Sequence, residues 1–178
     1  GINANEAMVP MLQTLLDIHR QTQQSEKHHD DRFDPPVLSW NFGVSDSCNA
    51  VNITPAKSVA WVSLRPMPNI DGRDFMDLVA ERAESLGLEY EVCEGGSPFW
   101  IDPSASCIRD MCTLAAGQPK TVCYGTDGGE FSELKHRVVC GPGDIVQAHT
   151  ADEWLEIDQL EKGIDLYEKA IRFWCGSS

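Results

Sequence analysis

The segment LSWNFGV at residues 38–44 decides the fold of the first half of the chain. Apolar residues alternate with small or polar ones along it, which predicts a strand with one buried face and one solvated face. The apolar positions are Leu38, Trp40, Phe42 and Val44. A second segment, VAWVSLR at residues 59–65, alternates in the same way and predicts a second strand, with Ala60, Val62 and Leu64 on one side. The turn-rich residues 46–57 would connect the two strands.

Apolar residues at helical spacing predict one helix on each side of these strands. The first runs from Gly1 to about Arg20, and residues 21–36 after it are polar enough to predict a solvated loop. The second begins near Asp74, which can cap it, and stops at Gly87. The stripe of the first helix is Met8, Leu12, Leu15 and His19, widened by Met11 and Ile18, and that of the second is Phe75, Leu78, Val79 and Leu86.

A third strand is predicted at residues 88–93. The order helix, strand, strand, helix, strand fits an antiparallel sheet with two helices on one face. This is an α+β domain of the ferredoxin-like split βαβ type without its first strand, so we expect the sequence to be truncated before Gly1. The segment EGGSP at residues 94–98 is the best domain boundary, and the predicted domains are residues 1–93 and 94–178.

The second domain is predicted to contain alternating α and β elements. A helix should open at Pro103-Ser104 and close at Gly117, with Ile108, Met111, Cys112 and Ala115 on its apolar side. Short apolar runs at residues 121–124 and 137–140 are typical of buried strands. A long helix should cover residues 156–175, with the stripe Leu160, Ile164, Tyr167, Ile171 and Trp174. Two strands are too few for a complete sheet, which is a second indication of truncation.

Charge and cysteine content narrow the class of protein. The formal net charge is −14, and this field repels phosphate backbones and anionic membrane surfaces, so nucleic-acid and membrane binding are not expected. No apolar run approaches the roughly 20 residues that span a bilayer. The seven cysteines are scattered, and none forms a Cys-x-x-Cys pair. We therefore expect reduced, buried thiols in a cytosolic protein.

Two glycine-containing loops hold candidate functional residues. YGTDGGE at residues 124–130 can gather backbone N–H groups on an anion, although a tight turn is the simpler interpretation. GPGDIVQAHTADE at residues 141–153 contains His149, whose ring Asp152 and Glu153 can orient. An ordinary polar loop histidine is the alternative. The other histidines, at positions 19, 28, 29 and 136, show no chelating spacing, and one ligand is too few for a metal centre built by this chain alone.

Asn52 and Arg65 are further candidates. Asn52 lies in the predicted connection between the strands and Arg65 ends the second strand. An Asn in a turn is usually structural, and a strand-end Arg is usually a surface ion-pair partner. The functional alternative is that Arg65 binds a carboxylate in bidentate fashion.

Taken in order, four segments resemble the zinc-dependent deacylase and exopeptidase superfamily of acetylornithine deacetylase, succinyl-diaminopimelate desuccinylase, aminoacylase and carboxypeptidase G, the peptidase M20 family. They are GINA at residues 1–4, NITP at 52–55 followed by Arg65, YGTDGG at 124–129, and GPGD through HTADE at 141–153. The last segment is the most specific. The resemblance covers nearly the whole chain.

The resemblance implies a role for each region. Residues 1–93 would be the lid or dimerisation domain, and residues 94–178 the C-terminal part of an α/β zinc-exopeptidase catalytic domain. His149 matches a zinc ligand. Asn52 and Arg65 match lid residues that grip the substrate carboxylate, often across a dimer, and Gly125 and Thr126 match a turn that anchors the substrate. Some relatives have an Arg just after that turn, where this chain has Gly129-Glu130.

The implied activity is metal-dependent removal of an acyl group from an N-acyl amino acid by a homodimer, with two zinc ions or, alternatively, cobalt. The sequences of these motifs are most similar to those of acetylornithine deacetylase. The general-base Glu and the other ligands would lie in a missing N-terminal half, so we expect this chain to be inactive alone. The alternatives are a succinyl-diaminopimelate desuccinylase, an aminoacylase or carboxypeptidase, a non-catalytic dimerisation or binding module, and a small α/β domain without a ligand.

Overall fold

The computed structural model describes residues 2–47 and 50–176. Contacts divide the chain into two compact units: residues 1–99 with 121–125, and residues 100–120 with 126–178. The domain boundary predicted after residue 93 falls in an exposed segment without regular structure that precedes the second unit. The mixed α/β content predicted for the chain is confirmed, with four α-helices and a two-stranded antiparallel sheet among the described residues.

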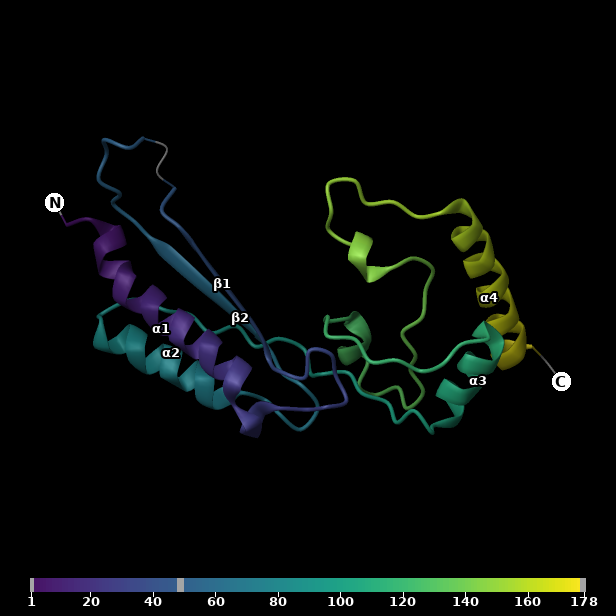
Figure 1. Cartoon of the computed structure of the whole chain (residues 1–178). Helices are drawn as coiled ribbons and strands as arrows, with labels where there is room; N and C mark the ends of the chain where they lie inside the picture. Colours follow the sequence, from purple (N-terminus) through teal and green to yellow (C-terminus); the bar gives the residue numbers. More distant parts are fainter. Residues whose placement is uncertain (1, 48–49, 177–178) are drawn as a thin grey trace. The chain divides into compact units, whose positions relative to one another are not determined.

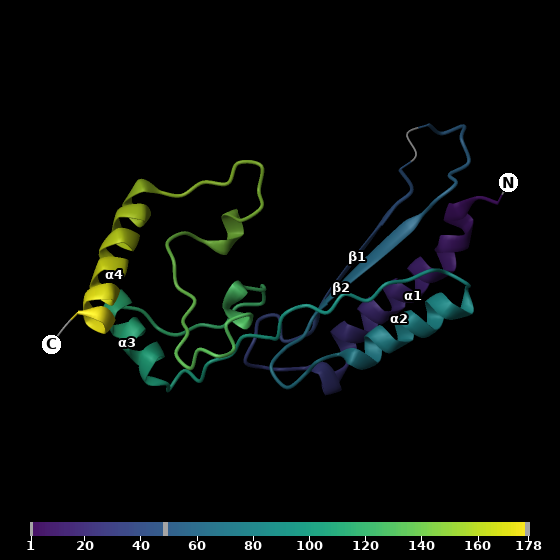
Figure 2. The ribbon, with the colours of Figure 1, turned by 180° about the vertical axis from the view of Figure 1, so that it is seen from behind.

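The first unit is built on a β-hairpin and two helices. Strands β1 (Ser39–Ser45) and β2 (Val59–Arg65) pair antiparallel, and the register places Trp40 opposite Leu64. Helix α1 (Ala4–Gln24) contacts both strands and also helix α2 (Arg73–Ser85), and the two helices lie side by side in both ribbon views (Figures 1 and 2). Both predicted strands of the hairpin are therefore confirmed.

The core of this unit lies between α1 and the hairpin. It contains most of the apolar stripe predicted for the first helix. Leu15, Ile18 and Leu38 are almost completely inaccessible to solvent. The other buried members of the cluster are Met8, Met11, Trp40, Met67 and Phe75. The alternating face of β1 is covered over its first half only, because Phe42 is half-buried and Val44 is exposed. Burial of this apolar surface is the main stabilising contribution to the unit.

Helix α1 continues into the segment predicted to be a solvated loop. It begins at Ala4, after the cap Asn3, and ends at Gln24; Gly1 lies outside the described residues. Thr22 is buried and donates a hydrogen bond from Oγ1 to the backbone carbonyl of His19. A short 3-10 helix η1 (Glu26–His28) follows, and His28 is also buried. The loop prediction failed here because polar side chains can be buried when hydrogen bonds satisfy them.

Helix α2 begins differently from the prediction and ends as predicted. Its N-cap is Gly72, with a φ of 68°, whereas Asp74 lies in the first turn and makes contacts to η1 instead of capping. At the other end Gly87 has a φ of 65°, and the N–H of Leu88 bonds back to the carbonyl of Ala83. A glycine suits both positions because a left-handed conformation costs it little.

The strand predicted at residues 88–93 does not form. A strand needs a neighbour whose N–H and C=O groups complete its ladder. Within the part of the chain that the structure describes, the sheet consists of β1 and β2 alone. Apolar alternation was a sound signal for the hairpin, but it cannot show whether a third segment has a partner.

The second unit contains helices α3 (Ser106–Ala115) and α4 (Ile157–Cys175), which contact each other, and two 3-10 helices, η2 (Asp127–Gly129) and η3 (Ile145–Gln147). Helix α3 starts two residues after the predicted Pro103-Ser104. It ends at Ala115, and its C-cap Ala116 adopts the left-handed conformation expected of Gly117. The predicted buried strands at residues 121–124 and 137–140 are absent, and all of these residues are exposed or half-buried without strand partners.

The helix predicted at residues 156–175 is confirmed as α4, but the apolar stripe predicted for it is not buried. The five apolar side chains of the stripe are 43–62% exposed. The buried residues of α4 are instead the small Gly163 and Ala170, and the ring of Pro142 lies against Gly163. Small side chains allow close approach, so the ring of Pro142 packs directly on α4 at Gly163.

The cysteine prediction is only partly right. All six described cysteines are free, but Cys107 alone is buried. Cys112 and Cys140 are intermediate, and Cys93, Cys123 and Cys175 are exposed, while Cys48 lies outside the described residues. No helix within residues 2–47 and 50–176 has both the length and the apolar character needed to cross a bilayer.

Candidate functional site

The loop that carries His149 is held by hydrogen bonds within itself. The carboxylate of Asp144 accepts a bond of 3.0 Å from the N–H of Val146 and so caps η3. His149 is exposed and has a φ of 62°. Its backbone N–H donates to the Glu153 carboxylate at 3.2 Å. Glu153 was predicted to orient the ring, but this contact fixes the backbone of the loop instead.

As a metal ligand, His149 offers one exposed imidazole. A structural or catalytic zinc centre takes three or four protein donors. Among the residues that the structure describes, no three His, Cys, Asp or Glu side chains lie close enough together to hold an ion. The described residues therefore fit one position of a zinc site and do not complete it.

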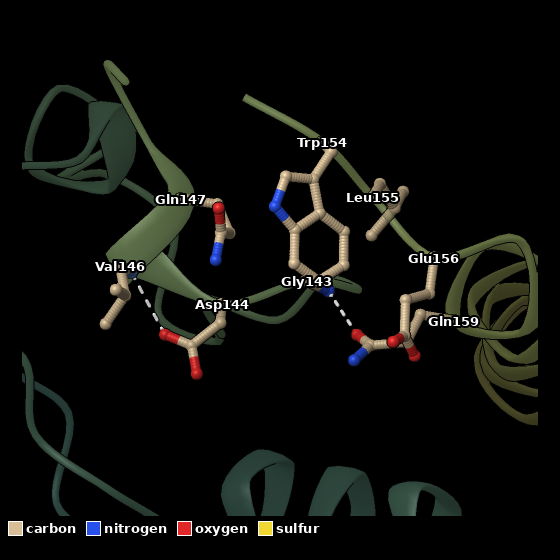
Figure 3. A pocket seen from close by; sticks show the side chains of 8 residues that line it. All are labelled: Gly143, Asp144, Val146, Gln147, Trp154, Leu155, Glu156 and Gln159. Carbon is tan, nitrogen blue, oxygen red and sulfur yellow. Dashed lines mark hydrogen bonds between the residues drawn. The ribbon is translucent and has the colours of Figure 1, made fainter. Parts of the chain in front are cut away.

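A shallow pocket of about 300 Å³ lies on the same loop, next to the start of α4 (Figure 3). Its lining residues are Gly143, Asp144, Val146, Gln147, Trp154, Leu155, Glu156 and Gln159. The amide oxygen of Gln159 accepts a bond of 2.7 Å from the N–H of Gly143, which joins the loop to α4. Trp154 stands between Gln147 and Glu156 in Figure 3. His149 does not line this pocket, so the structure does not place the predicted ligand in it.

The turn at Gly125 and Thr126 satisfies its own backbone groups. Thr126 Oγ1 accepts a bond of 3.2 Å from the N–H of Gly128, and the N–H of Glu130 bonds to the carbonyl of Asp127. Arg137 donates to the carbonyl of Gly128 at 2.7 Å. These N–H groups are used within the turn and are not gathered on an anion. Gly125 itself is exposed.

Asn52 and Arg65 are both exposed, and the structure does not bring them together within one copy of the chain. Asn52 lies in the turn that connects the strands, ahead of the first residue of β2, and Arg65 is the last residue of β2. A strand of seven residues spans about 20 Å at the usual rise per residue. One carboxylate is far too small to bridge that separation.

The structure assembles one polar cluster that the sequence interpretation missed. Ser25 Oγ lies 2.8 Å from His28 Nδ1, and His28 Nε2 lies 3.1 Å from Asp74 Oδ1. The other oxygen of Asp74 accepts a bond of 2.7 Å from the ammonium of Lys27. That hydrogen bond from Lys27 is the largest cause that holds the pKa of the Asp74 carboxyl below its ordinary value.

This Ser25–His28–Asp74 cluster lines a second shallow hollow, of about 370 Å³, with Gln21, Gln24, Phe75 and Leu78. The Ser-x-x-His spacing at the end of α1 is a local pattern that could have indicated the contact between Ser25 and His28. Nothing in the sequence pattern indicated that the first turn of α2 would supply the carboxylate, because that contact depends on the packing of α1 against α2.

Comparison with known proteins identifies the class. Residues 1–91 match the model of the M20 family described as the peptidase dimerisation domain. This match covers about half of the 178 residues, so the chain belongs to this family, and the resemblance stated from its motifs is confirmed.

The most similar curated relatives include acetylornithine deacetylases. The one from Pasteurella multocida (strain Pm70) is 29% identical over 98% of this chain and 47% of its own length. The one from Vibrio atlanticus (strain LGP32) is 30% identical over 98% of this chain and 48% of its own length. A third, from Vibrio vulnificus (strain CMCP6), is 29% identical with the same coverage of both chains. The chain therefore spans about half the length of the curated relatives it matches.

Proposed function

We propose that the chain is part of a metal-dependent amidohydrolase that removes the acyl group from an N-acyl amino acid, as an acetylornithine deacetylase does. The observation that carries this proposal is the alignment of acetylornithine deacetylases with 98% of the chain, together with the dimerisation-domain match over residues 1–91. The relatives are hydrolases by name, which supports membership of an enzyme family.

We assign His149 to the metal, as one ligand of a zinc site. Its exposure on a loop whose backbone is fixed by Glu153 supports this role, because a ligand must be accessible and its loop must be held in place. Bound zinc would supply an activated water molecule for hydrolysis. The remaining ligands and the general-base glutamate would be supplied by polypeptide outside this chain, so the chain alone should not hydrolyse N-acyl amino acids.

We assign the other four predicted residues to the substrate. Asn52 and Arg65 would bind its carboxylate, and Gly125 and Thr126 would anchor the rest of it. The separation of Asn52 from Arg65 along β2 favours a homodimer in which each copy contributes one of the two residues to a given site. An exposed guanidinium at a strand end suits bidentate binding of a carboxylate.

Activity assays test the proposal. The 178-residue chain and the complete product of its gene are each incubated with N-acetylornithine and N-succinyl-diaminopimelate, with zinc or cobalt added. We expect turnover of N-acetylornithine by the complete product and none by the chain alone. Turnover by the chain alone would contradict the assignment of the missing ligands. Absence of turnover on both substrates, and on other N-acyl amino acids and dipeptides, would contradict the hydrolase assignment.

Single substitutions in the complete product test the residue roles. His149→Ala should lower the bound zinc measured by metal analysis, and Arg65→Ala should raise KM by roughly tenfold or more, as expected for a lost charge-assisted pair. Arg73→Ala is the matched control, because Arg73 is an exposed arginine at the start of α2. Unchanged zinc content in the first variant would exclude His149 as a ligand.

A second candidate is a non-catalytic dimerisation or binding module. It is favoured by the family match, which covers the dimerisation domain, and by the absence of a three-ligand group among the described residues. Analytical ultracentrifugation combined with zinc titration separates the two candidates. A dimeric complete product that binds no stoichiometric zinc would support the module.

A further inference from the structure

The Ser25–His28–Asp74 cluster has the order of contacts of a base-activated nucleophile. A hydroxyl contacts one ring nitrogen of a histidine, and a carboxylate contacts the other, at 2.8 and 3.1 Å. Such arrangements are recognised by geometry and by the role of each group, and they occur on unrelated folds. This cluster lies wholly within the first unit and shares no residue with the site of the proposed function.

The contacts define which nitrogen carries the proton in the neutral ring. An ionised carboxylate can only accept hydrogen bonds, and the salt bridge from Lys27 at 2.7 Å keeps Asp74 ionised. His28 Nε2 must therefore be the donor to Asp74. In the neutral imidazole the other nitrogen, Nδ1, then has a free lone pair, which accepts the hydroxyl hydrogen of Ser25. A base in this state is ready to take the Ser25 proton.

Packing keeps the ring in this orientation. The side chain of His28 is only 7% exposed, and the centroid of its ring lies 4.5 Å from that of Phe75. A ring bonded at both nitrogens and packed on an aromatic side chain cannot turn without breaking these contacts. Partial exclusion of water also strengthens the hydrogen bonds of the ring. Ser25, by contrast, is only half-buried and lies on the wall of the hollow.

The hollow can accept a small acyl group. Phe75 and Leu78 contribute apolar side chains to the lining, and Gln21 and Gln24 line the same hollow as Ser25. Carboxamide N–H groups can stabilise the negative charge that develops on a carbonyl oxygen during attack. The lining therefore combines a nucleophile, a base, an orienting carboxylate and neutral donors.

We propose that Ser25 is an activated nucleophile that accepts the acyl group of a small activated ester. In this step Ser25 Oγ attacks the ester carbonyl carbon, and the hydroxyl proton moves to His28 Nδ1. The bond from the carbonyl carbon to the leaving oxygen then breaks, and the alcoholate or phenolate departs. The imidazolium returns its proton to the leaving group or to solvent, so that Ser25 carries an ester and the histidine is neutral again.

The test incubates the 178-residue chain with para-nitrophenyl acetate. EDTA is present so that metal-dependent hydrolysis does not contribute. Released nitrophenolate is followed by absorbance, and peptide mass spectrometry locates the acetyl group. We expect acetylation of Ser25. His28→Gln should slow it by about 100-fold or more, the usual contribution of a positioned base, and Asp74→Asn should slow it by a smaller factor.

Two variants serve as controls. Ser25→Ala should abolish the label at this site, whereas Ser106→Ala, which changes an exposed serine at the start of α3, should leave the rate unchanged. Circular dichroism shows whether each variant is folded. The proposal is overturned if Ser25 is not acetylated in the unmodified chain. It is also overturned if folded His28→Gln is acetylated at the rate of the unmodified chain, since Ser25 would then react as any surface hydroxyl does.

Discussion

The indole N–H of Trp40 donates a hydrogen bond of 3.1 Å to the backbone carbonyl of Leu15, and it does so inside the core of the first unit. It joins β1 to the middle of α1. A buried indole usually finds a partner for its N–H, and this one finds a carbonyl in the helix that covers the sheet.

Trp40→Phe should therefore destabilise the first unit by about 1–3 kcal/mol, because it removes a buried donor and leaves a space beside the smaller ring. Urea unfolding followed by circular dichroism measures the change. Trp61→Phe is the matched control, since Trp61 is 50% exposed on β2 and its loss should change stability by only about 0.5 kcal/mol or less. Equal effects of the two substitutions would show that the bond to Leu15 contributes nothing.

Gly72 and Gly87 form a second matched pair, one at each end of α2. Both have a positive φ, 68° and 65°. A Cβ at Gly72 would lie 2.8 Å from Leu38 Cδ1 and 2.9 Å from Leu64 Cδ2, whereas nothing lies within 4 Å of a Cβ at Gly87. Leu38 is fully buried, so a shift of its side chain would disturb the core.

Gly87→Ala should cost about 1 kcal/mol, the usual penalty for a left-handed residue with a side chain. Gly72→Ala should cost that penalty plus the strain of overpacking, about 2–4 kcal/mol in total. Chemical unfolding of both variants gives the comparison. A smaller effect at Gly72 than at Gly87 would mean that the core near Leu38 can rearrange freely.

Local periodicity predicted the first unit well. The alternation at residues 38–44 and 59–65 and the stripe of α1 reflect one buried face each, and the structure confirms the hairpin and the buried Leu15. The failures have a common physical origin. Residues 88–93, 121–124 and 137–140 have strand-like composition, but a strand exists only where a partner completes its hydrogen bonds.

The same limit applies to the sites. The loop around His149 and the turn at Thr126 could be singled out as candidates from short motifs, because their residues are close in sequence. The Ser25–His28–Asp74 cluster could not, since Asp74 is brought to His28 only by the packing of α1 and α2. Asp74 was interpreted as a helix cap from its place before an apolar run, and its tertiary contacts replaced that local role.

Asp74 also links the stability of the first unit to pH. Its pKa is lowered in the folded chain, chiefly by the hydrogen bond from Lys27. The stabilisation that ionised Asp74 gives the folded unit is therefore complete above the ordinary carboxyl pKa of 3.8. It is lost as the pH falls through the lowered pKa of the folded state. Asp74→Asn should accordingly be less stable than the unmodified chain at pH 6, and the difference should shrink as the pH falls below about 4.

Thermal unfolding at a series of pH values measures this difference. Asp77→Asn, at an exposed position one turn further along α2, controls for the loss of one negative charge from the helix. A difference between the unmodified chain and Asp74→Asn that stays constant from pH 6 to about pH 2 would contradict the linkage.

The described cysteines should react with iodoacetamide in an order set by exposure and by thiolate content. Cys93, Cys123 and Cys175 are exposed and should be alkylated first. Burial, followed by the neighbouring Cys112, raises the pKa of the Cys140 thiol. Since the thiolate is the reactive form, Cys140 should react roughly tenfold more slowly than Cys123 near neutral pH, and the buried Cys107 should react last.

Peptide mass spectrometry of a labelling time course gives the individual rates. In concentrated urea the differences should largely disappear, because every thiol is then solvated, and this control separates folding from local sequence. Cys112→Ser should speed the alkylation of Cys140 slightly, since burial is the larger cause of its raised pKa and remains in place. If Cys140 reacts as fast as Cys123 in the folded chain, the contacts that shield it in the second unit are not formed in solution.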